Sequence, residues 1–212
     1  MFKPKLIIFD LDGTLINAYP AIIRSFNYTL RKLGYPPQDK LTIRRAVGWG
    51  DENLLKPFIK LNDLKKALKI YRKHHKNALI KESFLFNKVK KLLVYLKNKN
   101  YLLAVASNRP TKFSLILLKH LKIKKYFDYI LCADKLKHIK PHPEILNKIM
   151  QRFSVSSSQT VYVGDMAIDA QAGRRAKVKT IIVTTGSSTK EEIKKQKPYR
   201  IISQISELFY IF

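Results

Sequence analysis

The chain has 212 residues, which is enough for one compact core with a small inserted domain. Hydrophobic residues make up 46% of it and charged residues 27%, a balance that argues against a disordered chain. No apolar run reaches the ~18 residues of a membrane-spanning helix. The single cysteine, Cys132, excludes an internal disulfide and argues against a cysteine metal cluster. We therefore expect a cytoplasmic protein without a membrane partner.

The net charge is strongly positive: 42 Lys and Arg stand against 15 Asp and Glu, which gives +27. A nucleic-acid-binding protein can have this composition, because a phosphate backbone attracts clustered positive charge. Here the basic residues are dispersed along the chain, and no nucleic-acid-binding motif is present. We favour a solvated lysine-rich surface, whose field would attract small anionic substrates toward a cleft.

Apolar β runs alternate with amphipathic helices along most of the chain, which is typical of a parallel sheet covered by helices. Continuous apolar strands of this kind suit a sheet that is buried on both faces. The predicted strands span residues 5–9, 101–106, 129–132, 160–163, 179–183 and, as a short sixth, 200–202.

One stretch interrupts the alternation. Between about residues 17 and 83 the apolar spacing is helical and no convincing strand occurs. A first helix in this stretch ends at Gly34 and the Pro36-Pro37 pair. We interpret the stretch as a helical cap over the carboxyl end of the first strand, where ligands bind in open α/β sheets.

Two carboxylates follow the first predicted strand, in Asp10-Leu11-Asp12-Gly13-Thr14. Side chains at this spacing can point into one cleft, where Asp10 can attack an electrophile while Asp12 transfers protons. Taken alone the pattern is weak, because the same residues suit an ordinary turn.

Polar segments also follow two later strands. Ser107 and Asn108, before a helix, suit an oxyanion cradle, although an ordinary helix N-cap uses the same residues. Asp165 and Asp169, after the fourth strand, suit a hard cation, although acidic residues are also favoured at helix N-termini. Lys140 precedes a proline-initiated helix and can present its ammonium group to the same cleft.

Together these segments provide a nucleophile, an acid/base, metal ligands and a cation, which are the parts that phosphoryl transfer requires. Their sequences are FDLDGTL at 9–15, SN at 107–108, KPHP at 140–143 and GDMAID at 164–169. In this order they resemble the motifs of the haloacid dehalogenase (HAD) superfamily, in its phosphoglycolate phosphatase-like branch. The resemblance covers the whole chain. It implies an α/β fold with a Rossmann-like parallel-sheet core, formed by residues 1–15 and 84–212, and a small α-helical cap, residues 16–83.

The resemblance also implies residue roles. Asp10 would form an aspartyl-phosphate, and Asp12 would protonate the leaving oxygen and then deprotonate the hydrolytic water. Mg²⁺ would be bound by the Asp10 carboxylate, the Asp12 carbonyl and Asp165, while Asp169 would support the metal or pair with Lys140. The cation of Lys140 would offset the charge of Asp10 and of the phosphate.

Substrate contacts are implied in the core and in the cap. Thr14, with Gly13, would shape the nucleophile loop, and the phosphoryl oxygens would be held by Ser107 and the N–H of Asn108. In the cap, Arg45 could bind a second anionic group of the substrate, with Gly48 permitting its close approach. The alternative for this segment is a helix end with Trp49 packed against the core, and both interpretations stay open.

We therefore expect a Mg²⁺-dependent phosphatase, a monomer or homodimer, that hydrolyses a small phosphorylated metabolite resembling phosphoglycolate. Asp12 argues against a dehalogenase, which needs no acid for its leaving group. Three alternatives remain: an inorganic pyrophosphatase, a β-phosphoglucomutase-like phosphotransferase, and a basic nucleic-acid-binding protein on a phosphatase fold. A nucleic-acid partner is not expected.

Overall fold

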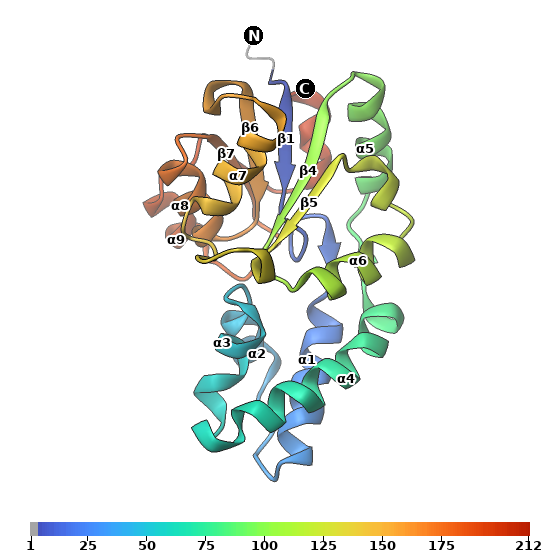
Figure 1. Cartoon of the computed structure of the whole chain (residues 1–212), viewed down its shortest axis with the longest axis vertical. Coiled ribbons are helices and arrows are strands. Elements are labelled where there is room, and N and C mark those ends of the chain that lie inside the picture. The colour runs from blue at the N-terminus through green and yellow to red at the C-terminus, as the bar shows by residue number, and fades with distance from the viewer. Residues whose placement is uncertain (1–3) are drawn as a thin grey trace.

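A six-stranded parallel sheet forms the centre of the molecule, as the computed structural model of residues 4–212 shows (Figure 1). Its strand order is β5-β4-β1-β6-β7-β8. The strands are β1 (Leu6–Phe9), β4 (Leu102–Ser107), β5 (Tyr129–Cys132), β6 (Thr160–Gly164), β7 (Lys179–Val183) and β8 (Arg200–Ile202). All six predicted strands are confirmed, with ends that differ by at most one residue, and so is the α/β fold class.

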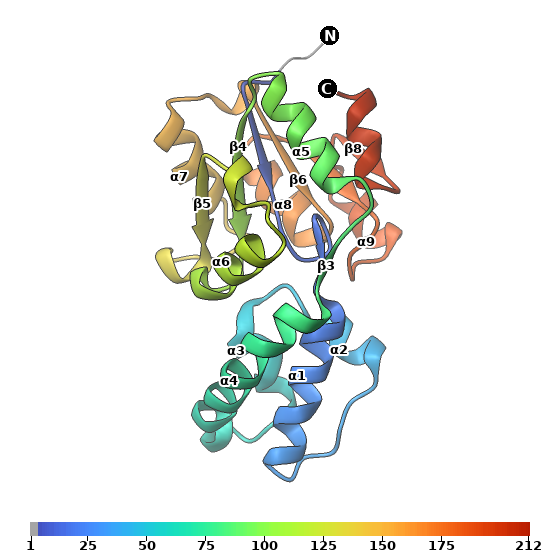
Figure 2. The same ribbon diagram turned by 90° about the vertical axis from the view of Figure 1, so that its right-hand side faces the viewer.

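Helices cover both faces of the sheet, so alternate residues of each strand enter different cores. Ile7 and Phe9 of β1 pack in one cluster, whereas Leu6 and Ile8 pack in the other. Figure 2 shows α5 in front of the sheet and α8 behind it. The covering helices are α5 (Val89–Asn98), α6 (Thr111–His120), α7 (Glu144–Phe153), α8 (Ala167–Arg175) and α9 (Lys190–Lys195).

Four further helices form a separate layer below the carboxyl ends of the strands (Figures 1 and 2). They are α1 (Tyr19–Lys32), α2 (Lys40–Ala46), α3 (Gly50–Leu55) and α4 (Leu64–Glu82). The long helices α1 and α4 pack along each other. The buried residues of α1, which include Ile22, Ser25 and Phe26, recur at helical spacing on the face that α4 covers.

Two short strands join this layer to the sheet domain. β2 (Ile16–Asn17) and β3 (Phe84–Leu85) pair antiparallel where the chain leaves the core and returns to it. The sequence did not predict them, because two residues are too few to show a strand period. The exact domain limits, residues 16–83 for the cap, stay a prediction.

The register of the sheet determines where the site lies. Phe9 of β1 is level with Val105 of β4 on one side and with Val163 of β6 on the other. The residues that follow these three parallel strands therefore emerge together, at the edge of the sheet that faces the four helices. Among residues 4–212 no helix is both long and apolar enough to cross a membrane.

Candidate active site

The loop after β1 carries the predicted nucleophile and acid/base. Asp10 is 7% exposed, and the chain turns at Gly13, whose φ is 82°. A Cβ at Gly13 would lie 2.1 Å from Oδ2 of Asp165, so the turn requires a glycine both for its backbone angle and for space. This close approach holds the loop against the segment that follows β6.

Lys140 lies in the centre of the site, although it is almost completely buried. Its Nζ donates to Oδ1 of Asp10 at 2.8 Å and to Oδ1 of Asp169 at 2.9 Å. The Tyr162 hydroxyl and the Ala106 carbonyl lie 2.9 and 3.1 Å from the same nitrogen. Burial lowers the pKa of an ammonium group, but the two carboxylates outweigh this and raise the pKa of Lys140 above its ordinary value. Its charge is therefore permanent.

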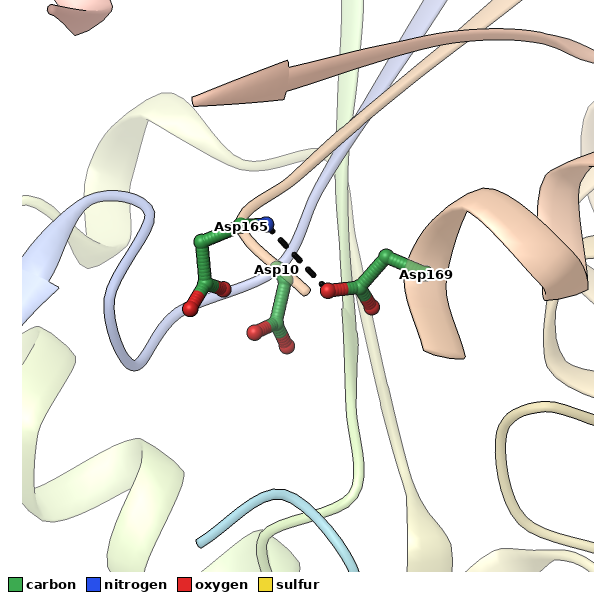
Figure 3. A group of neighbouring side chains, drawn as sticks. All are labelled: Asp10, Asp165 and Asp169. Carbon is green, nitrogen blue, oxygen red and sulfur yellow. Dashed lines mark hydrogen bonds between the residues drawn. The ribbon is translucent and has the colours of Figure 1, made fainter. Parts of the chain in front are cut away.

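Asp10, Asp165 and Asp169 form a buried group whose carboxylate oxygens lie within 4.8 Å of one another (Figure 3). Oδ1 of Asp165 accepts a hydrogen bond of 2.9 Å from the hydroxyl of Thr14. Asp169 accepts hydrogen bonds from the Tyr162 hydroxyl and from the backbone N–H of Asp165 (Figure 3). Asp169 thus pairs with Lys140, one of the two predicted roles, and it also lies in the first turn of α8.

The electrostatics of this group fit a divalent cation. Burial raises the pKa of Asp10 to about 7, against the lowering effect of Lys140. Burial, with Asp169 and Asp10 nearby, also raises the pKa of Asp165 well above its usual range. Several buried carboxylates face one another across a short distance, and a hard cation, which prefers oxygen ligands, would offset their repulsion. The three aspartates can therefore hold a divalent metal.

We expect the stability of the metal-free protein to fall as the pH rises from about 4 through 7. The unfolded chain releases the Asp10 proton near its ordinary pKa of 3.8, whereas the folded protein keeps it until about 7. A cation binds the ionised carboxylates and should offset this loss. Added Mg²⁺ should therefore raise the Tm more at about pH 8 than at about pH 5, as thermal melts with Mg²⁺ and with a chelator can measure. Equal shifts at the two pH values would contradict this assignment of the site.

Asp12 is held by an arginine. Nε and Nη2 of Arg109 donate to the two carboxylate oxygens of Asp12 at 2.9 and 2.8 Å, in a bidentate pair. The third nitrogen, Nη1, lies 2.8 Å from Nε2 of His75, which comes from α4 in the cap. Arg109 directly follows the Ser107-Asn108 pair, but neither it nor His75 was predicted from the sequence as a site residue. Both residues belong to the site.

Ser107 and Asn108 lie at the end of β4 as predicted, but they do not cap α6, whose N-cap is Pro110. The Asn108 side chain accepts from the N–H of Lys140 at 3.0 Å and donates to the carbonyl of Gly48 at 2.8 Å. It thus joins the lysine segment to the cap. Ser107 is buried, and its hydroxyl accepts a hydrogen bond from the N–H of Arg109.

Core and cap enclose a cavity of about 50 Å³, enough for a few water molecules. Of the predicted site residues, Asp10, Asp12, Ser107, Asn108, Lys140, Asp169 and Gly48 line it. The cap adds Asp51, Leu54 and Tyr71, none of which the sequence analysis singled out. Asp51 resembles an ordinary acidic residue at a helix start, so it gave no signal.

The structure does not bring Arg45 to this cavity. Its Nη1 donates to the carbonyl of Ser187 at 2.7 Å, and its guanidinium forms an ion pair with Glu192. Arg44 donates to the carbonyls of Thr185 and Gly186, in the same loop. The two arginines thus anchor the end of α2 to the core.

Trp49, which the alternative interpretation of this cap segment packs against the core, is 41% exposed, and that interpretation stays a prediction. Gly48 has a φ of 115°, a backbone conformation that favours glycine, and a Cβ there would lie 2.7 Å from Sδ of Met166.

A buried aspartate beside a buried lysine, at the carboxyl ends of parallel strands and under a helical cap, fits a hydrolase that transfers phosphoryl groups. The family model described as "Haloacid dehalogenase-like hydrolase" matches residues 7–183. A phosphoglycolate phosphatase of Pasteurella multocida is 33% identical over all of this chain and 99% of its own length. One of Colwellia psychrerythraea is 30% identical over 97% of this chain and 96% of its own.

A crystal structure described as a predicted phosphoglycolate phosphatase from Haemophilus somnus superposes with a TM-score of 0.95. It is 28% identical and covers all of this chain and 99% of its own. The chain therefore belongs to the haloacid dehalogenase-like hydrolases, in the branch that resembles phosphoglycolate phosphatases. It is a phosphatase of this family, as the motifs predict.

Proposed function

We propose that the protein is a Mg²⁺-dependent phosphatase that hydrolyses a small phosphate monoester through an aspartyl-phosphate on Asp10. One observation carries the proposal: the Asp10 carboxylate lines the cavity with one oxygen 2.8 Å from the buried ammonium of Lys140. A carboxylate and a phosphate repel each other, and a fixed cation beside them reduces this repulsion and so lowers the barrier to attack on phosphorus.

The first half of the reaction transfers the phosphoryl group to the protein. A carboxylate oxygen of Asp10 attacks phosphorus, and the bond from phosphorus to the leaving oxygen breaks. Asp12, in its protonated form, gives its proton to that oxygen, so that an alcohol leaves. The hydroxyl of Ser107 and the backbone N–H of Asn108 hold the phosphoryl oxygens, and Thr14 keeps the nucleophile loop against Asp165.

The second half hydrolyses the aspartyl-phosphate. Asp12, now a carboxylate, takes a proton from water, the hydroxide attacks phosphorus, and the bond to Asp10 breaks to release inorganic phosphate. Mg²⁺ bound to Asp10, Asp165 and the Asp12 carbonyl would offset the negative charge of the phosphoryl group. Lys140 lowers the pKa of Asp10, against the larger raising effect of burial, and also pairs with Asp169.

The test is a phosphate-release screen over small phosphate esters, phosphoglycolate and pyrophosphate, with Mg²⁺ and with a chelator. Release from esters that stops with chelator supports the proposal. Release from pyrophosphate alone would indicate a pyrophosphatase. Transfer of the phosphoryl group between sugar hydroxyls without release would indicate a phosphomutase. No turnover of any compound would contradict the proposal.

Arg45 remains our proposed contact for a second anionic group, but it must first leave Glu192. Among the described residues that line the cavity, the cations Lys140 and Arg109 are both paired with aspartates. A substrate carboxylate therefore competes with Glu192 for the Arg45 guanidinium.

Glu192→Gln should raise kcat/KM for phosphoglycolate by up to about fivefold, because an exposed ion pair is weak and its loss frees the Arg45 guanidinium. Ethyl phosphate, which lacks the carboxylate, is the matched control and should not respond. Arg45→Ala should lower kcat/KM for phosphoglycolate alone. Identical responses of the two esters would show that Arg45 only anchors the cap.

A further inference from the structure

His75 connects the cap to the proton-transfer residue of the core. It lies on α4, it is 1% exposed, and its Nε2 is 2.8 Å from Nη1 of Arg109. Arg109 belongs to the core, and its two other nitrogens donate hydrogen bonds to the carboxylate of Asp12. One guanidinium thus bridges a cap histidine and the carboxylate that we assign to proton transfer.

The chemistry of arginine determines the state of this histidine. A guanidinium has only donors, so Nε2 of His75 must accept and must carry no proton. The proton of the neutral ring is then on Nδ1, which is 3.2 Å from the hydroxyl of Ser25 on α1. Burial, with the charge of Arg109, lowers the pKa of His75 well below its ordinary value, in agreement with a neutral ring.

Aromatic rings from both domains hold the imidazole in place. Tyr71, one turn earlier on α4, stacks on it with centroids 4.8 Å apart. Phe113 of α6 meets it edge-on at 5.4 Å, and α4 packs against α6 (Figure 1). The ring therefore has little freedom to move away from Arg109 while the cap is seated on the core.

We propose that His75 is a positioning residue that couples closure of the cap to proton transfer by Asp12, acting through Arg109. This inference rests on the proposed function. When the cap is closed, Nε2 of His75 accepts a hydrogen bond from Nη1 of Arg109 and so orients the guanidinium. Nε and Nη2 of Arg109 then orient the carboxylate of Asp12. When the cap is open, Arg109 loses this partner and Asp12 is less well oriented. Closure of the cap over the substrate thereby places Asp12 in the orientation that proton transfer requires.

The test uses a phosphate ester that the wild-type protein hydrolyses. His75→Ala should lower kcat ~10–100-fold, the range for residues that orient a catalytic group, with little change in KM. In His75→Gln, the amide oxygen can accept from Arg109 and the amide N–H₂ can donate to Ser25, so kcat should recover to within several-fold of wild type. An alanine variant that keeps the KM and the Tm of wild type while it loses kcat is folded, so its loss of activity is not misfolding.

His74→Ala is the matched control. This neighbour also contacts the Ser25 hydroxyl, at 3.0 Å, and stacks on Tyr28, whereas the ring that contacts Arg109 is that of His75. Its kcat should stay within about twofold of wild type. An equal loss of kcat in His74→Ala and His75→Ala would mean that the cap is merely damaged, and it would overturn the inference.

A double-mutant cycle isolates the route through Arg109. If His75 acts only through the guanidinium, then His75→Ala should change kcat by less than about twofold in an Arg109→Ala background. If the effects of His75→Ala and Arg109→Ala on kcat are fully additive, or if His75→Gln fails to restore kcat, the inference is overturned while the proposed function stands. Absence of activity in the wild type would instead remove the proposed function, so the two failures are distinct.

Discussion

Asp10→Asn should abolish turnover, with kcat falling ~10⁴-fold or more. The amide has nearly the shape of the carboxylate, but it cannot attack phosphorus at a useful rate. Because the variant removes one of three buried carboxylates, we also expect the metal-free protein to gain stability at neutral pH and to respond less to Mg²⁺. Phosphate release and thermal melts with and without Mg²⁺ measure the two effects.

The control is Asp128→Asn, the same chemical change at an aspartate that pairs with Lys97 and lies outside the cavity lining. This variant should keep its activity. Phosphate release by Asp10→Asn at a rate near that of wild type would refute the nucleophile assignment, whatever the fold of the variant. Loss of activity in both variants would show that the assay reports folding and not chemistry.

Lys140→Ala should affect both activity and stability. The ammonium is the one buried cation, among the residues described, that contacts both Asp10 and Asp169. Without it, the phosphate meets an uncompensated carboxylate, and kcat should fall ~10²–10³-fold. Two buried charges also lose their partner, which should lower the free energy of unfolding by ~3–5 kcal/mol at neutral pH.

The stability loss in Lys140→Ala should shrink at acidic pH, because protonation of the remaining carboxylates removes their repulsion. Denaturant unfolding at about pH 5 and about pH 8 gives the comparison. Lys148→Ala is the control, because Lys148 pairs with Glu144 on the exposed surface of α7. Loss of this surface pair should change the free energy of unfolding very little. Equal losses in the two lysine variants would contradict a central role for Lys140.

Much of the site could be predicted because its parts are local in sequence. Each motif follows an apolar strand, and parallel strands place their carboxyl ends on one edge of the sheet. The register that sets Phe9 level with Val105 and Val163 therefore brings Asp10, Ser107 and Asp165 together. This convergence follows from the strand pattern alone.

The contacts of the cap could not be predicted in the same way. His75 lies in a helix whose periodicity predicts only which face is buried, and its partner Arg109 is 34 residues away. Arg45 carried the right charge for an anionic substrate, but its helix end faces the Ser187 loop and Glu192. Charge and spacing identify side chains that can bind, whereas domain packing decides which partner they meet.

The Asp10-x-Asp12 pair shows most clearly what the sequence determines and what only the tertiary structure decides. By itself the sequence determined which motifs follow which apolar strands and that two carboxylates come after β1, because these depend on local hydrophobicity and on the parallel sheet. The role of the cation at Lys140 was implied by the family resemblance. Only the tertiary structure decided that Arg109 donates hydrogen bonds to Asp12 and that His75 of the cap contacts Arg109. Asp12 and Arg109 are 97 residues apart in the sequence, and His75 and Arg109, which lie in the cap and the core, are 34 apart. No local sequence pattern can predict contacts between residues so far apart.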